Sequence, residues 1–439
     1  MLALVDADAF FCNCERLRHP QAPLRPTIVL SRNDGIIVSA DWMAKDLGLK
    51  VGLPYFQIKD ICLQHQVMVC SSHFELYQDI STRLMELLAE EAEIEVYSVD
   101  EAYLHLPSRM PWTAPRLLAY GEKIISHVAQ QIGIPVSVGL APTKVLAKVA
   151  SYTAKHPSLQ NKVFGKENFL RQDNQIISGH SGRSVFITPH LLARISSANA
   201  PHPLLQNFKV ENLWGIGPAT AVELRLLGIA TAEQLRCYPY SASLSRAARQ
   251  IQLELQGHPV FIAEAPAKQK SFLHSRSFSP PLTDRTSILD KLRDFVGQTA
   301  TQLREQNSTC QKIKVFCGLG RPGLAGFTPF LERKTYSAEF KFMDPTSDTR
   351  KLIKAAENLL TELTKQTTIV YRLGIELSMI YSDEVQRQNF LEENDTPASQ
   401  NLMQVVDQIN QQEGPGAINF GRAAPAKENP PPSFLAKSK

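Results

Sequence analysis

The chain has 439 residues, of which 43% are hydrophobic and 21% charged, a composition typical of globular domains. Its length predicts about three domains. No apolar run reaches the roughly 18 residues that span a bilayer, and the acid at position 6 argues against a signal peptide. Seven scattered Cys without a CxxC pair indicate neither a zinc site nor a disulfide framework. We therefore expect a cytoplasmic protein without a membrane partner.

Charge is distributed unevenly along the chain. Residues 268–383 hold 18 Lys and Arg against 12 Asp and Glu, whereas residues 1–267 hold 24 of each and residues 384–439 hold 5 against 7. A basic segment of this kind suits a polyanionic partner. A chance surplus of basic residues on a solvated surface explains the numbers equally well, so charge alone leaves nucleic-acid binding open.

Strands and helices alternate irregularly over the first 157 residues. Apolar runs predict strands at 2–10, 26–31, 35–40, 66–72 and 135–142, and a strand pair over 94–106. Apolar residues at helical spacing predict helices over 40–52, 74–92, 116–133 and 143–157. This order favours a mixed α+β domain.

The second half of the chain predicts a glycine turn that opens a helix over 213–228, followed by a second compact α+β unit over 268–380. Residues 170–205 are polar and show no clear pattern. The tail from residue 384 is rich in Gln, Asn and Pro, and we expect it to be largely a linker. It holds one short helix candidate, 399–412, whose predicted apolar face consists of Leu402, Val405, Val406 and Ile409.

Two adjacent acids, Asp100 and Glu101, interrupt the strand-like run VYSVDEAYLHL. An unpaired carboxylate is costly in a low dielectric, so a basic side chain, water or a metal must neutralise them. Asp6 ends the N-terminal strand, and three hard oxygen ligands suit Mg²⁺. Two such ions roughly 4 Å apart activate a hydroxyl nucleophile and stabilise a leaving pyrophosphate. Solvated acids are the common alternative for such a set.

Two further patterns suit phosphate groups. The glycines of WGIGPAT allow successive N–H groups to point outward before a helix whose N-terminal end is positive, although an ordinary corner between helices fits equally well. Lys144 and Lys148 share a helix face, and Lys155 lies near the end of the same helix. They suit a triphosphate, but helix capping or solvation is the favoured explanation of these lysines taken alone.

Four stretches in order and spacing resemble Y-family DNA polymerases, and more closely the UmuC branch, the catalytic subunits of bacterial DNA polymerase V and their plasmid-borne relatives. They are DADAFFCNCE, YSVDEAYLHL, VGLAPTKVLAKVASYTAKHP and LWGIGPATAVELRLLGI. The resemblance extends from residue 2 to residue 421. It implies an error-prone translesion DNA polymerase that acts in SOS mutagenesis and DNA repair.

The resemblance also implies a fold, an α+β right-hand polymerase. A ferredoxin-like palm would comprise residues 1–10 and 76–165, and small fingers residues 11–75. A helical thumb with a helix-hairpin-helix would follow over 166–255, then a separate α+β little finger over 268–383. Residues 384–439 would form a partly disordered tail with partner-binding segments.

Roles for individual residues follow from the same resemblance. Two Mg²⁺ ions would be bound by Asp6, Asp100, Glu101 and the carbonyl of Ala7, with Asp8 as a neighbour. The remaining positions would bind substrates. Phe11 would be the steric gate that collides with a 2′-hydroxyl, with Phe10 as its support. The incoming nucleotide would also be bound by Ser39, Lys45 and Lys155. DNA would be bound by Gly215, Gly217 and Lys148.

The partners implied are primer-template DNA and dNTP, a UmuD′-like dimer, a RecA filament and a sliding clamp. Clamp contact would use Gln386, Phe390 and Leu391 in QRQNFL, for which plain linker is the alternative. Two other classes compete. Diguanylate-type cyclases carry glycines before the paired acids, where Ser98 and Val99 stand here. A catalytically inactive, polymerase-like DNA-binding accessory protein would have lost the metal carboxylates, which this chain keeps.

Overall fold

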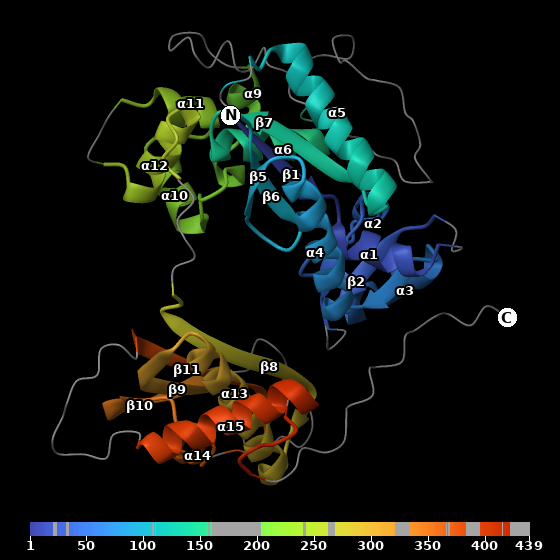
Figure 1. Ribbon diagram of the computed structural model, residues 1–439. Helices are drawn as coiled ribbons and strands as arrows, with labels where there is room; N and C mark the ends of the chain where they lie inside the picture. The colour runs from blue at the N-terminus through green and yellow to red at the C-terminus, as the bar shows by residue number, and fades with distance from the viewer. Residues whose placement is uncertain are drawn as a thin grey trace. The chain divides into compact units, whose positions relative to one another are not determined.

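The computed structural model describes residues 1–20, 24–31, 35–107, 109, 111–156, 159, 203–239, 243–261, 268–320, 334–365, 367, 369–382, 396–414 and 416–421. They form two compact units, Met1–Ala263 and Glu264–Pro430, each with its own hydrophobic core (Figure 1). The boundary falls just before the basic segment 268–383. In these ranges no helix is both long and apolar enough to cross a membrane.

A four-stranded antiparallel sheet forms the centre of the first unit. Its strand order is β5-β6-β1-β7, so the N-terminal strand is an inner strand with a neighbour on each side. The predicted strand pair is confirmed, with Asp100 at the end of its turn and Glu101 at the start of the second strand. The strands are β1 (Leu2–Ala7), β5 (Glu93–Val96), β6 (Glu101–His105) and β7 (Val136–Ala141).

Helices cover both faces of this sheet, and the side chains of β1 alternate between them. Ala3, Val5 and Ala7 share a core with α4 and α5, whereas Leu2 and Leu4 share a core with α6. Since successive side chains of a strand point to opposite faces, Asp6 lies on the α6 side. The helices are α4 (Phe74–Ala89), α5 (Ala114–Gln131) and α6 (Lys144–Lys155).

A smaller three-stranded sheet, in the order β3-β2-β4, lies between α1 and α4 along the chain. The helix predicted over 40–52 is wrong in length, because α2 ends at Asp46 and Gly48 follows in a left-handed conformation (φ 81°) that terminates the helix. The elements are α1 (Phe10–Arg18), β2 (Thr27–Leu30), β3 (Ile37–Ala40), α2 (Trp42–Asp46), α3 (Tyr55–Gln64) and β4 (Met68–Ser71).

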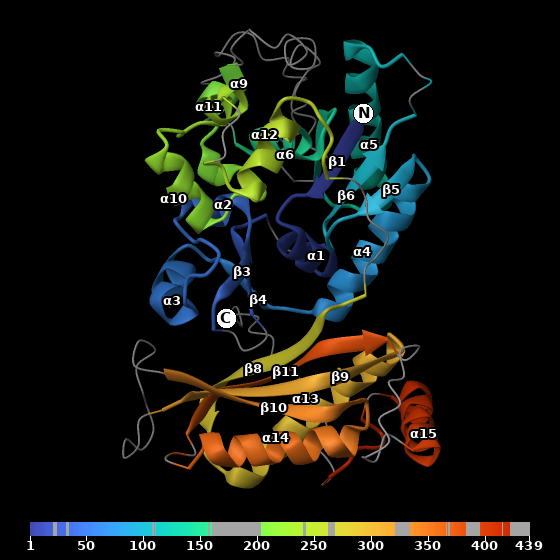
Figure 2. The ribbon, with the colours of Figure 1, turned by 90° about the vertical axis from the view of Figure 1, so that its left-hand side faces the viewer.

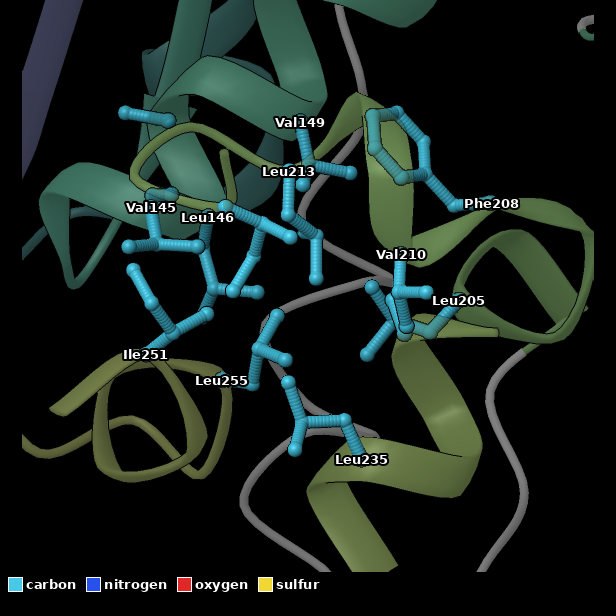
Figure 3. Close-up of a cluster of buried hydrophobic side chains, with 14 of the residues drawn as sticks. Val145, Leu146, Val149, Leu205, Phe208, Val210, Leu213, Leu235, Ile251 and Leu255 are labelled. Carbon is cyan, nitrogen blue, oxygen red and sulfur yellow. The ribbon is translucent and has the colours of Figure 1, made fainter. Parts of the chain in front are cut away.

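A layer of short helices packs on the side of α6 that faces away from the sheet. Figure 3 shows Val145, Leu146 and Val149 of α6 gathered with side chains of this layer, among them Ile251 and Leu255. Consequently α6 lies between two apolar surfaces, which fixes the side chains at its rim. The layer consists of α9 (Pro203–Asn207), η1 (Val210–Asn212), α10 (Pro218–Leu226), α11 (Ala232–Cys237) and α12 (Arg246–Leu255).

The second unit is a four-stranded antiparallel sheet in the order β10-β9-β11-β8, with α13 and α14 packed on one face (Figure 2). The predicted second α+β unit is confirmed. Its elements are β8 (Ser271–Leu282), α13 (Arg285–Glu305), β9 (Ser308–Leu319), β10 (Lys334–Thr346), α14 (Thr349–Leu363) and β11 (Val370–Ser382).

The tail contains α15 (Pro397–Glu413), which extends beyond the predicted 399–412 and belongs to the second unit. Its predicted apolar face is only partly correct, because Val406 is buried and Ile409 half-buried as expected. Met403 and Val406 are buried, while 39% of Leu402 and 50% of Val405 are exposed. The reason is tertiary, because Asp407 accepts hydrogen bonds of 2.6 and 2.7 Å from Arg304 of α13. That pair turns the 403/406/407 side of the helix inward.

Candidate active site

The three acids singled out in the sequence converge at one end of two neighbouring strands. Asp6 of β1 lies directly opposite Glu101 of β6 in the strand register. The backbone N–H of Ala7 donates a hydrogen bond of 2.8 Å to the carbonyl of Asp100. Residues almost a hundred positions apart in the chain thus form adjacent backbone positions at this sheet end.

Lysines of α6 neutralise these carboxylates. Lys148 and Lys155 are seven residues apart and share the helix face toward the sheet. Lys148 forms an ion pair with Glu101. The ammonium of Lys155 lies 2.7 Å from Oδ1 of Asp6 and 3.1 Å from Oδ1 of Asp8.

The hairpin itself supplies a hydrogen-bond partner for Asp100. The hydroxyl of Ser98 donates a hydrogen bond of 2.5 Å to Oδ1 of Asp100. One turn earlier on α6, the buried Lys144 forms an ion pair of 2.5 Å with Glu95 of β5. The adjacent acids are therefore tolerated here because a basic side chain and a hydroxyl satisfy them.

Burial and neighbouring charge alter the acidity of this site. Burial, opposed by Lys155 and reinforced by the carboxylates of Glu101 and Asp8, raises the pKa of Asp6 to about 6. Burial alone would lower the pKa of Lys155, but the carboxylates of Asp8 and Asp6 outweigh it and raise the pKa. The raised pKa of Asp6 therefore reflects its burial first and the neighbouring carboxylates second.

The donor set fits a hard divalent cation. Carboxylates of Asp6, Asp100 and Glu101 and the adjoining backbone carbonyls are all oxygen donors, the kind that Mg²⁺ prefers. Among the described residues no three acidic, His or Cys side chains stand together as a preformed metal cluster. The carboxylates instead turn toward lysines and a serine, so their side chains must reorient for a shared ion.

The strand that ends in this site leads into two phenylalanines through an abrupt turn. Ala9, between β1 and α1, adopts a left-handed backbone (φ 42°) that is uncommon for a residue with a side chain. Phe10 is buried in the core beneath the sheet. The ring of Phe11 is stacked on that of Tyr77 of α4, with centroids 4.3 Å apart and an interplanar angle of 13°.

The other residues expected at the nucleotide are placed on the smaller sheet and its helix. Ser39 of β3 is buried and accepts a hydrogen bond of 3.3 Å from the thiol of Cys12 in α1. Ser39 therefore contacts the residue that follows Phe11 in α1. Lys45 is exposed on α2.

The glycine hairpin precedes α10 and is joined to the acidic hairpin by an aromatic contact. Gly215 has a left-handed backbone (φ 86°), whereas Gly217 is the N-cap of α10. Trp214, next to Gly215, donates a hydrogen bond of 2.8 Å from Nε1 to the hydroxyl of Tyr97 in the acidic hairpin. Lys148 lies 4.9 Å above the Tyr97 ring. Tyr97 and Trp214 escaped the sequence reasoning, although both stand within the quoted motifs.

The three residues expected to bind a clamp, Gln386, Phe390 and Leu391, lie outside the described residues. The same applies to most of the segment 170–205.

A comparison with solved structures identifies the fold. The chain is similar to a Y-family DNA polymerase chimera of Dbh and Dpo4, with a TM-score of 0.64 at 22% identity over 87% of this chain and 99% of that one. At that identity the likeness establishes the fold, which is the α+β fold of Y-family DNA polymerases. The expected fold class is therefore confirmed.

Family models and relatives show which family the chain belongs to. Residues 5–152 match the impB/mucB/samB family, and residues 269–391 match the C-terminal domain of the same family. The chain belongs to the impB/mucB/samB family. It is 30% identical to protein UmuC of Salmonella typhimurium strain LT2, over 96% of this chain and 93% of that one.

Two more relatives extend the same result. Protein SamB of Salmonella typhimurium is 30% identical over 98% of this chain and 94% of its own length. A DNA polymerase IV of Dehalococcoides mccartyi strain CBDB1 is 25% identical over 97% of both chains. The protein is a translesion DNA polymerase with a divalent metal cofactor. These findings do not favour the inactive accessory protein.

Proposed function

We propose that the end of β1 and β6 is the nucleotidyl-transfer centre, where Asp6, Asp100, Glu101 and the carbonyl of Ala7 hold two Mg²⁺ ions. The observation that supports it most is the register that sets Asp6 opposite Glu101 beside the bonded pair Ala7–Asp100. Such ions supply activation of the primer 3′-hydroxyl and charge stabilisation at the leaving pyrophosphate. The chain itself contributes positioning and preorganised charge, which dominate phosphoryl transfer.

The lysines of α6 and the phenylalanines after β1 would handle the incoming dNTP. Lys155, which lies beside the acids, would bind the triphosphate. Phe11 would lie under the sugar as the steric gate, with Phe10 as its buried support. Binding at the base and triphosphate would be completed by Ser39 and Lys45.

The first unit would hold primer-template DNA through backbone phosphates. The positive φ of Gly215 bends the hairpin, and Gly217 leaves open space in front of α10, so phosphate oxygens can approach the N–H groups there. Lys148, at the rim of α6, would add a further cation. In the terms of a right-handed polymerase, this helical layer is the thumb and the main sheet is the palm.

The second unit would serve as the little finger. Its segment 268–383 carries a net charge of +6. That charge suits gripping DNA phosphates without reading bases. The smaller sheet with α2 and α3 would then be the fingers, and the enzyme would act in the cytoplasm.

Metal-dependent primer extension tests the proposed centre. Asp100→Asn keeps the size of the side chain but removes its charge, and we expect the rate of nucleotide insertion to fall by a factor of at least about 100. Asp79→Asn alters an exposed acid on α4 and is the matched control. If the lone chain is inert, a UmuD′-like dimer and RecA filaments are added to all samples. Wild-type rates for D100N would overturn the proposal.

A sliding clamp would bind through Gln386, Phe390 and Leu391. The sequence QRQNFL departs from a Gln-rich peptide ending in Leu-Phe, because Asn389 replaces the expected Leu and Leu391 follows Phe390. Pull-down of the clamp by the wild type and by the F390A/L391A variant tests this contact. Equal recovery would remove it.

A further inference from the structure

A buried carboxylate of α1, that of Glu15, is hydrogen-bonded to the ring that stacks on Phe11. Only 1% of the Glu15 surface is exposed, and a carboxylate so placed must be hydrogen-bonded or paired. Its Oε1 accepts a hydrogen bond of 2.7 Å from the hydroxyl of Tyr77 and lies 2.7 Å from Nδ1 of His73. Its Oε2 lies 3.4 Å from the guanidinium of Arg18. Glu15 thereby joins α1 to the start of α4.

Tyr77 connects this carboxylate to the proposed steric gate. Its ring is 2% exposed and stacks on Phe11, while its hydroxyl points to Glu15. Phe74 contacts both rings edge-on, with centroids 6.0 Å from Phe11 and 5.9 Å from Tyr77. Burial raises the pKa of Tyr77, so the hydroxyl stays protonated as a donor. Phe11 therefore stacks on a ring whose hydroxyl is hydrogen-bonded to a buried carboxylate.

We propose that Glu15 is a positioning residue for sugar selection, which anchors Tyr77 and through it fixes the ring of Phe11. The inference rests on the proposed role of Phe11 as the steric gate. An aromatic ring rejects a 2′-hydroxyl only if it cannot yield, since a small displacement relieves the collision. Stacking alone permits sliding, because its energy is broad and modest. A charge-assisted hydrogen bond on the supporting ring restricts that freedom.

The selective readout is the ratio of kcat/KM for dNTP to that for the matching rNTP. Loss of the anchor frees the ring, so we expect Glu15→Ala to lower this ratio about tenfold. Glu15→Gln keeps an acceptor for Tyr77, so it should retain the ratio within about threefold of wild type. Glu75→Ala removes an exposed glutamate in the first turn of α4 and is the matched control.

Tyr77→Phe provides a second, milder variant, because it deletes only the hydroxyl and keeps the stacked ring. It should lower the ratio in the same direction, and the E15A/Y77F double variant should fall no further than E15A, since both remove one interaction. Thermal unfolding of every variant is measured beside the ratio. A ratio that stays at the wild-type value in both E15A and Y77F, whatever the loss of stability, overturns the inference.

Phe11→Ala distinguishes a failure of the proposed steric gate from a failure of the anchoring role of Glu15. If F11A lowers the ratio while E15A and Y77F do not, the steric gate stands and the anchoring role of Glu15 fails. If F11A leaves the ratio unchanged, the proposed gate itself is wrong and the inference fails with it.

Discussion

Lys155 donates a hydrogen bond of 2.7 Å from Nζ to Oδ1 of Asp6, across 149 residues of sequence. The contact depends on two packing layers at once, because β1 presents Asp6 toward α6 and the helical layer holds α6 in place. It keeps a cation beside the acids. Under the proposed function, Lys155 would exchange this carboxylate for a substrate phosphate.

Replacement of Lys155 tests this transfer. Lys155→Met keeps the aliphatic stem but loses the charge, and we expect the KM for dNTP to rise about tenfold, since a hydrogen bond to a charged group contributes roughly 1.5–3 kcal/mol. Single-nucleotide insertion kinetics measure it. Lys155→Arg should keep most of the affinity, and Lys59→Met, at an exposed position of α3, is the control. An unchanged KM in K155M would argue against a triphosphate contact.

The glycine hairpin offers a matched pair for stability. Gly215 has φ 86°, and an added Cβ would lie 2.9 Å from Cδ1 of Ile251, whereas Gly217 has φ −80° and open space around it. Because left-handed backbone costs a residue with a side chain roughly 1–2 kcal/mol, we expect Gly215→Ala to reduce the free energy of unfolding by about that amount. Gly217→Ala should change it by less than about 1 kcal/mol. Urea titration followed by circular dichroism compares them, and equal losses would contradict the backbone argument.

The docking of α15 should depend on pH. Asp348 caps α14 and accepts a hydrogen bond of 2.5 Å from Ser399 of α15. Burial works against its ionisation, but hydrogen bonds from Arg350 and Ser399 outweigh burial and lower the pKa of Asp348 to about 2. A depressed folded-state pKa stabilises the fold above the unfolded value near 3.8, and the gain disappears as pH falls to 2.

Asp348→Asn isolates this charge, because Asn still caps a helix. We expect the variant to be less stable than the wild type by about 2 kcal/mol at pH 7 and nearly equal to it at pH 2. Unfolding of the full chain in urea across this range measures the difference. Asp284→Asn changes an exposed cap of α13 and should have a smaller effect. A difference that persists undiminished at pH 2 would exclude the carboxylate as its source.

The size of the smaller sheet predicts tolerance of damaged templates. Its three strands have four residues each, and α2 has only five, so little structure is available to close over a templating base. We expect primer extension to continue past an abasic site. Gel analysis of extension on matched intact and abasic templates measures it, with strict stalling at the lesion as the opposing result.

Much of the fold could be predicted because its periodicities are strong. The strand pair around the acids and the second α+β unit follow from apolar spacing. The length of α2 could not be predicted by periodicity, because the left-handed Gly48 ends the helix while apolar residues continue. The buried face of α15 could be predicted only in part, since an ion pair to Arg304, distant in sequence, decides which side is buried.

The candidate site also contains residues that the sequence reveals and contacts that only the fold reveals. Asp100 and Glu101 stand out in the sequence because charge interrupts an apolar strand. Which lysine pairs with which acid depends on how α6 lies over the sheet, and no local pattern encodes that. Glu15 looks like an ordinary helix residue in the sequence. Its importance emerges only when α4 brings the hydroxyl of Tyr77 against it.

The alternation along β1 constrains how this gene can change. Odd positions fill the core under α4 and α5, and even positions face α6, where Asp6 belongs. Insertion or deletion of one codon within the strand would exchange the two sets, sending a carboxylate into the apolar layer. Many apolar replacements at Ala3 or Val5 preserve the pattern. Natural variation should therefore preserve the number of residues in this strand more strictly than their identities.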